Sequence, residues 1–181
     1  MALNLSDTSN FVPNIRWMAS TSTWQRSSEN GTEVVNWSEA VFDLAEIETG
    51  WLSIAAGLAP EFRKDPDLKT ACPKPTDDGE WKRGFRVMMY AEAIGGLREG
   101  TTNSKGALIG IDTLHDLYLT QKGENPGKVP VVKFDGAQPI KLGQGHTSVP
   151  QLTITKWIDK PTGMRDADNG NGQVTSNAEF A

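Results

Sequence analysis

Residues 104–121 read SKGALIGIDTLHDLYLTQ, and this stretch decides the fold. Its apolar side chains recur at the spacing of one helical face, at Ala107, Leu108, Ile111, Leu114 and Tyr118. Asn103 is a candidate N-cap, and Lys122-Gly123 marks a stop. The pattern predicts one helix over 104–121, and we find no other convincing helical segment in the sequence.

Segments with the alternation of a β-strand surround this helix. The expected strands are a hairpin within 37–56 that turns at Thr49-Gly50, a strand over Lys82–Tyr90, its return partner over 97–102 after Gly95-Gly96, and two strands over 128–134 and 151–158. Residues 59–80 contain four prolines and predict one long loop, and residues 136–150 are turn-rich.

This order of elements predicts a mainly β domain, a five-stranded OB-like barrel with its helix between strands 3 and 4. Other small barrels and α+β sheets with one covering helix share the same order. The expected organisation is an N-terminal arm or edge strand over 1–36, the OB-like domain over 37–160, and a flexible C-terminal tail over 161–181 that has almost nothing apolar to bury.

Charge is distributed unevenly along the 181 residues, whose net charge is −5. Residues 1–80 carry −7, residues 81–158 carry +4, and residues 159–181 carry −2. A basic block between acidic flanks favours an anionic ligand, although scatter on a solvated surface gives the same numbers.

Catalytic signatures are sparse. His115 and His146 lack cysteine partners and zinc-ligand spacing, so no metal is expected. Cys72 lies in a proline-rich polar stretch and indicates an incidental thiol. Alternating carboxylates at Asp43, Glu46 and Glu48 are more typical of a solvated strand edge than of an acid–base site. We therefore expect a non-enzymatic protein without cofactors.

The longest apolar runs are far shorter than the ~20 residues of a membrane-spanning helix. Residues 1–10 show no basic start followed by an apolar stretch, so a secretory signal is not expected. These features predict a cytoplasmic protein with no membrane partner.

Aromatic and cationic residues gather on the outward positions of the expected strands. Bases of a single strand stack on aromatic rings while Lys and Arg follow the phosphates, and neither contact requires a particular base. The candidate nucleic-acid-binding residues are Trp51, Trp81, Lys82, Arg86, Tyr90, Arg98, Lys105, Lys133 and Trp157. Any single Trp among them could equally cap the end of the core.

Three segments also resemble a known family. WKRGF at 81–85, GKVPVVK at 127–133 and QLTITKWI at 151–158 resemble small bacteriophage and prophage single-stranded DNA-binding proteins of the OB-fold type, over residues 38–160. The resemblance implies sequence-independent binding of single-stranded DNA in phage replication or recombination, inside a bacterial host cell. It also implies recruitment of replication proteins through the tail, which here ends in Ala178-Glu179-Phe180-Ala181 and is only weakly acidic.

Two alternatives remain open. A structural phage component, for virion assembly or decoration, would use Ser/Thr-rich arms and an edge strand to pack subunits into a homo-oligomer. A carbohydrate-binding barrel would use Trp51, Trp81 and Trp157 as sugar platforms, but it lacks neighbouring acidic and amide groups.

Overall fold

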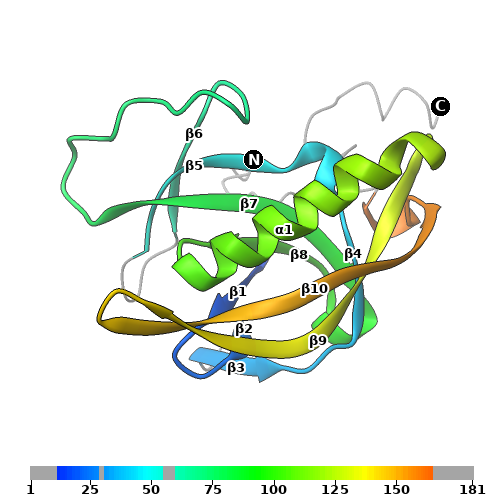
Figure 1. The fold of residues 1–181 in the computed structure, drawn as a ribbon, viewed down its shortest axis with the longest axis horizontal. Coiled ribbons are helices and arrows are strands. Elements are labelled where there is room, and N and C mark those ends of the chain that lie inside the picture. Colours follow the sequence, from blue (N-terminus) through cyan, green and yellow to red (C-terminus); the bar gives the residue numbers. More distant parts are fainter. Residues whose placement is uncertain (1–11, 29–30, 55–59, 165–181) are drawn as a thin grey trace, which may run out of the picture.

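A single sheet of ten strands organises the described part of the chain (Figure 1). The computed structural model describes residues 12–28, 31–54 and 60–164. The strands and helices, in chain order, are β1 (Asn14–Met18), β2 (Thr23–Ser28), β3 (Gly31–Val35), β4 (Glu39–Phe42), the 3-10 turn η1 (Leu44–Glu46), β5 (Glu48–Ser53), β6 (Glu61–Lys64), β7 (Trp81–Ala91), η2 (Glu92–Ile94), β8 (Gly96–Thr102), α1 (Lys105–Gln121), η3 (Lys122–Glu124), β9 (Lys128–Leu142) and β10 (Gly145–Asp159).

The sheet is open and mixed. Its strands run in the order β10-β9-β4-β7-β8-β1-β2-β3, and β5 pairs with both β6 and β7. All pairs are antiparallel except β1 with β8, in which Ile15 lies beside Gly100. The mainly β character with one α-helix among the described residues is confirmed, but the closed five-stranded barrel is wrong. The helix follows the eighth of ten strands, rather than the third of five, because the sheet recruits strands from both ends of the sequence.

Strand β7 lies at the centre of the sheet. It is long enough to pair with several strands, and its side chains alternate between the two faces of the sheet. Phe85, Val87 and Met89 are buried, as predicted, on what we call the core face. Three strands pair with β7: β5 along its first half, β4 at its end, and β8 on its other side. The predicted hairpin between residues 37 and 56 is wrong, because β4 and β5 each pair with β7 instead of with each other. The turn η1 separates them.

Helix α1 lies over the core face and packs along β10 (Figure 1). Its expected extent is confirmed within one residue, but the N-cap is Ser104, whose hydroxyl accepts a hydrogen bond from the Ala107 amide at 3.2 Å. Leu114 and Tyr118 are buried from the helix. Gly106 meets the backbone carbonyl of Ser148 so closely that any side chain there would collide with it. The close contact of Gly106 with Ser148 therefore fixes where α1 packs on β10.

Four aromatic residues form the heart of the core. Trp17, Trp24, Trp37 and Phe134 contact one another with ring centroids 5.3–6.2 Å apart. They come from β1, β2, the segment before β4, and β9. The Trp17 indole also donates to the Ser148 carbonyl on β10 at 3.0 Å. The curved sheet thus brings its first and last strands together, and residues 14–37 contribute to the main core.

The long strands β9 and β10 form a ribbon that the sequence does not reveal. Residues 136–150, expected as a turn-rich stretch, continue both strands, and only residues 143 and 144 separate them. The ribbon contains register shifts between Pro150 and Leu152 and between Ile154 and Lys156. Residues 59–80 likewise contain a strand, β6, so the expected uninterrupted loop is wrong.

A smaller apolar cluster covers part of the opposite face of the sheet. Val41, Val129 and Val131 pack there with Met164, which lies in a helical turn at residues 162–164 and is 1% exposed. The expected flexible tail over 161–181 lies outside the described residues from 165 onwards. Among the described residues, no helix is long and apolar enough to cross a membrane.

Candidate nucleic-acid interface

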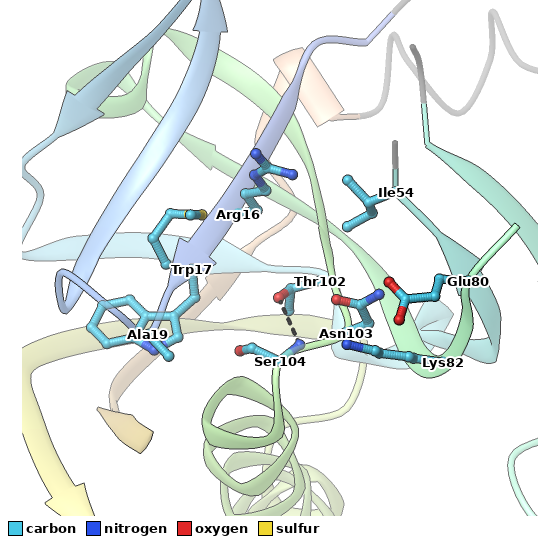
Figure 2. Close-up of a pocket in the computed structure, with 10 residues that line it drawn as sticks. Arg16, Trp17, Ala19, Ile54, Glu80, Lys82, Thr102, Asn103 and Ser104 are labelled. Atoms are coloured by element: carbon cyan, nitrogen blue, oxygen red, sulfur yellow. Dashed lines mark hydrogen bonds between the residues drawn. The ribbon is translucent and has the colours of Figure 1, made fainter. Parts of the chain in front are cut away.

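A cleft of about 250 Å³ opens where β1, β5, β7 and the start of α1 meet (Figure 2). The strands reach this corner with their ends, so the lining comes from four separate parts of the sequence. The lining residues are Arg16, Trp17, Met18, Ala19, Ile54, Glu80, Lys82, Thr102, Asn103 and Ser104. The cleft therefore combines two cations, one carboxylate and several neutral hydrogen-bonding groups.

The two cations come from strand positions that face away from the core. On β1, Ile15 and Trp17 are buried, so alternation directs Arg16 to the opposite face. On β7, Lys82 occupies the position next to the buried Trp81 and is itself exposed. Within the described chain, neither Arg16 nor Lys82 has a carboxylate within ion-pair distance, although Glu80 lines the same cleft. Both positive charges remain available to a ligand.

The third cation is Lys105, the first residue of α1, which is exposed and follows Ser104 in the cleft wall. It too has no ion-pair partner among the residues that the structure describes. The Ser104 amide donates to the Thr102 hydroxyl at 3.3 Å, which holds the turn into the helix (Figure 2). Because Ser104 is the N-cap of a 17-residue helix, the positive end of the helix dipole adjoins the cleft. The corner thus favours a bound anion.

The structure does not bring the nine sequence-predicted residues together. Cross-strand partners share a face, so the register places Arg86, Tyr90 and Lys133 on the face opposite the core, together with Lys82. Alternation places Trp51, Trp81 and Arg98 on the same side as Phe85, and Trp157 lies against α1. Of the nine, only Lys82 lines the cleft, and Lys105 directly follows the lining residue Ser104. The predicted single outer surface is therefore divided.

Two of the predicted stacking rings are covered by the protein's own cations. The Arg83 guanidinium lies 5.1 Å from the Trp51 ring centroid, and the Lys74 ammonium lies 5.7 Å from it. Trp81 is buried, with the Arg63 guanidinium 5.1 Å from its ring. A nucleic-acid base would have to displace these contacts in order to stack.

Arg86 is neutralised where it lies. It donates to Glu48 at 2.6 and 2.9 Å, and Glu99 is 3.6 Å from its Nε atom. Burial would raise the pKa of Glu48, but hydrogen bonds from Lys64 and Arg86 outweigh it and hold that pKa below its ordinary value. Burial raises the pKa of Glu99. These carboxylates interrupt any basic path from Lys82 along the outer face of β7.

The four remaining predicted residues also have structural surroundings. Tyr90 packs beside the apolar cluster around Met164. Lys133 pairs with Asp135 at 3.4 Å. Trp157 stacks on Tyr118 at 5.7 Å and donates to the Gln121 side chain at 3.2 Å. Arg98 lies on the core face, away from the cleft, beside Arg26. 

Arg16 is the cleft residue that the sequence-based reasoning missed. The signal that could have found it is a cation between two buried apolar residues, Ile15 and Trp17, on a strand. The expected N-terminal arm over 1–36 therefore contains a strand, β1, and its alternation places Arg16 opposite the core.

Next to the cleft, a buried ion pair holds the long loop against the sheet. Asp65, 3% exposed, forms a two-pronged pair with Arg83, and accepts further hydrogen bonds from the Thr49 hydroxyl at 2.7 Å and the Cys72 amide at 3.0 Å. The Trp51 indole donates to the Cys72 carbonyl at 2.8 Å. We call Thr49, Trp51, Asp65, Cys72 and Arg83 the loop clasp.

The clasp determines the electrostatics of its members. Hydrogen bonds from Arg83 hold the pKa of Asp65 well below its usual range, against the opposing effect of burial. Burial, followed by the neighbouring Asp65 carboxylate, raises the pKa of the Cys72 thiol. A raised pKa leaves little thiolate at neutral pH, so this environment does not activate Cys72 as a nucleophile.

Metal binding has no geometric support in the described ranges. No group of three or more His, Cys, Asp or Glu side chains there could hold a metal ion. Comparison with family models, with curated proteins and with solved structures finds no match for this chain.

Proposed function

We propose that this protein binds single-stranded DNA without sequence preference, and that the cleft at Arg16, Lys82 and Lys105 holds the phosphate backbone. The observation that supports the proposal most directly is the absence of ion-pair partners for these three cations within the described residues. Other cations nearby, such as Arg83 and Arg86, are bound to carboxylates. Unpaired cations on one corner are what phosphate binding requires.

The hydrogen-bonding groups of the cleft suit the same ligand. Asn103 and Ser104 offer side chains that can contact phosphate or sugar oxygens, and such contacts carry no sequence information. Trp17 is the aromatic residue of the cleft lining, but it is 1% exposed. The proposed binding therefore depends on charge much more than on base stacking.

The order of strands and helix in this protein partly matches that of an oligonucleotide-binding (OB) domain. The strands β4 and β5, β7 and β8 precede α1, and β9 and β10 follow it. With the sequence resemblance, this order supports the proposed setting, a non-enzymatic role in bacteriophage DNA replication or recombination. The open ten-stranded sheet departs from a closed barrel, so the cleft carries the proposal rather than the fold.

The salt dependence of binding tests this function. Three phosphate contacts on a single strand predict that the logarithm of the binding constant falls with the logarithm of salt concentration with a slope of about −2. Fluorescence anisotropy of labelled oligo-dT, titrated with the full chain at several NaCl concentrations, measures this slope. Binding that is undetectable at micromolar protein in low salt, or that does not change with salt, would overturn the proposal.

A second candidate function is supported by one edge of the sheet. Among the described strands, β3 pairs only with β2, and its Val34 side chain is 52% exposed. An exposed edge strand with an apolar residue can add a strand from another subunit, as a virion assembly or decoration protein requires. Native mass spectrometry distinguishes the two candidates. An ordered homo-oligomer that Val34→Lys dissociates, in a protein without oligo-dT binding, would favour assembly.

A further inference from the structure

Two arginine side chains from different strands meet beside Gly95. Arg26 lies on β2 and Arg98 on β8. A side chain at Gly95 would collide with the Nη1 atom of Arg26 and the Nη2 atom of Arg98, so both guanidinium groups lie against this one glycine. Gly95 has φ 93°, in the left-handed region that favours glycine, and it ends the turn η2. The turn geometry therefore brings two positive charges together.

The negative charge at this point is too small to balance them. Arg26 donates to the Glu33 carboxylate at 2.5 Å and to the Ile94 carbonyl at 3.1 Å. Arg98 donates to the carbonyl of its own neighbour, Leu97, at 2.9 Å. Within the described ranges, Arg98 has no carboxylate partner, and its Nε atom is buried without a hydrogen-bond acceptor. One carboxylate thus faces two guanidinium groups.

We propose that Arg26 and Arg98 form an oxoanion site that binds a phosphate group. Placing like charges side by side in a partly buried position is unfavourable unless an anion compensates them. Guanidinium groups present planar forks of N–H donors that match phosphate oxygens. The Nε atom of Arg26 already donates to Glu33, and the other N–H donors of Arg26 and Arg98 approach from two different strands. A phosphate, with up to four oxygens and a charge near −2, suits them better than a carboxylate with two oxygens.

The electrostatics of Arg98 agree with this geometry. Burial, and then the neighbouring Arg26, lower the pKa of Arg98. The negative charge of a bound phosphate would raise the pKa of Arg98 again, against burial and the charge of Arg26.

This site is separate from the cleft proposed to bind DNA. Ile15 lies opposite Arg26 in the antiparallel pair of β1 and β2, so the two side chains share a face. Arg16 follows Ile15 on β1 and therefore faces the other way. Phosphate binding at Arg26 and Arg98 and DNA binding in the cleft can therefore be tested independently of each other.

Titration of the full chain with inorganic phosphate tests the proposal, with NaCl at matched ionic strength as reference. Arginine Hε–Nε resonances in an NMR spectrum and isothermal calorimetry report binding. We expect saturable shifts of Arg26 and Arg98. Arg98→Gln should weaken phosphate binding at least about tenfold, and Arg98→Lys, which keeps the charge but not the fork, should cause a smaller loss. Thymidine monophosphate, in a parallel titration, shows whether a nucleotide phosphate is preferred to the free ion.

Lys141→Gln supplies the matched control, because Lys141 is an exposed cation near the end of β9 without an ion-pair partner in the described chain. It should leave phosphate binding within about twofold. Non-saturable shifts in the wild-type protein, or equal losses in Lys141→Gln and Arg98→Gln, would overturn the site. An Arg98→Gln variant that loses oligo-dT binding to the same degree would overturn its independence. Urea unfolding of each variant checks the fold, and the wild-type titration decides even if a variant unfolds.

Discussion

Lys82 and Arg83 are neighbours on β7, and the protein uses their positive charges in opposite ways. Arg83 points toward Asp65, joins the loop clasp and lies over the Trp51 ring. Lys82 points into the cleft with Arg16 and has no ion-pair partner in the described part of the chain. One charge is satisfied within the fold, and the next is left for solvent or a ligand.

The contrast shows that residue type is a poor guide to a binding surface here. Lys82, Arg83 and Arg86 all come from the basic stretch 82–86, yet two of them are paired with carboxylates, Arg83 with Asp65 and Arg86 with Glu48. We expect the cations of the proposed DNA-binding cleft to differ from Arg83 and Arg86 by the absence of a carboxylate partner in the described chain. We therefore expect substitutions in the loop clasp to lower the stability of the protein, and substitutions in the cleft to weaken DNA binding.

The largest effect is expected from breaking the clasp. Asp65→Asn removes the carboxylate from a buried pair and leaves Arg83 without its partner, so the free energy of unfolding should fall by about 3 kcal/mol. Urea denaturation measures this loss. Asp78→Asn, at an exposed position of the same loop, is the control and should change stability by less than about 0.5 kcal/mol. Equal stability of the two variants would mean that the clasp does not hold the loop.

The same pair predicts how the clasp responds to acid. The pKa of Asp65 is lower in the folded than in the unfolded protein, so its ionised form stabilises the fold. That contribution is complete above the unfolded pKa of about 4, and it is lost as pH falls below this value toward the folded pKa. The stability difference between wild type and Asp65→Asn, from urea curves at several pH values, should therefore narrow below pH ~4. A constant difference down to pH ~2 would contradict the assigned ionisation.

Removing the cleft cations should weaken DNA binding without unfolding the protein. Lys82→Gln and Arg16→Gln should each lower oligo-dT affinity about three- to tenfold at low salt and reduce the salt slope by about 0.7, because each removes one phosphate contact. Their urea midpoints should match the wild type, since neither residue forms an ion pair within the described ranges. Anisotropy titrations with Lys141→Gln as control measure the difference. If the control loses as much affinity, the binding is unspecific attraction to the whole surface.

The smallest effect on DNA binding is expected from Lys133, and it tests how far the DNA-binding surface extends beyond the cleft. Lys133 was predicted as a contact, but it pairs with Asp135 on β9. Lys133→Gln should leave oligo-dT affinity within about twofold, because an exposed ion pair contributes little. An anisotropy loss as large as that of Lys82→Gln would place the DNA path across the outer face of β9 as well.

The sequence predicts those elements whose signals are local. Helix α1 and strand β7 show their periodicity within one segment, and Gly95-Gly96 marks the turn between β7 and β8. Alternation also indicates that Lys82 faces outward. None of these inferences requires knowledge of a distant partner.

The features that escaped prediction depend on pairing between distant segments. β4 and β5 resemble a hairpin, but both find partners on β7. Pro139 and Pro150 suggest loops, yet they are accommodated in the two-stranded ribbon of β9 and β10, close to a register shift. Likewise, only the assembled sheet shows that Glu48 and Glu99 neutralise Arg86. The cleft depends on the same assembly, since its lining comes from four separate parts of the sequence.

The parallel pairing of β1 with β8 has a consequence for the order of events during synthesis. Asn14 pairs beside Glu99, so β1 leaves the ribosome about 85 residues before the strand that receives it. At ~5–20 residues per second, Ile15 and Trp17 remain without their final neighbours for several seconds. The hairpin of β1 and β2 is therefore an early, exposed apolar segment, and pulse-labelling of nascent chains should find it protected only after β8 has emerged.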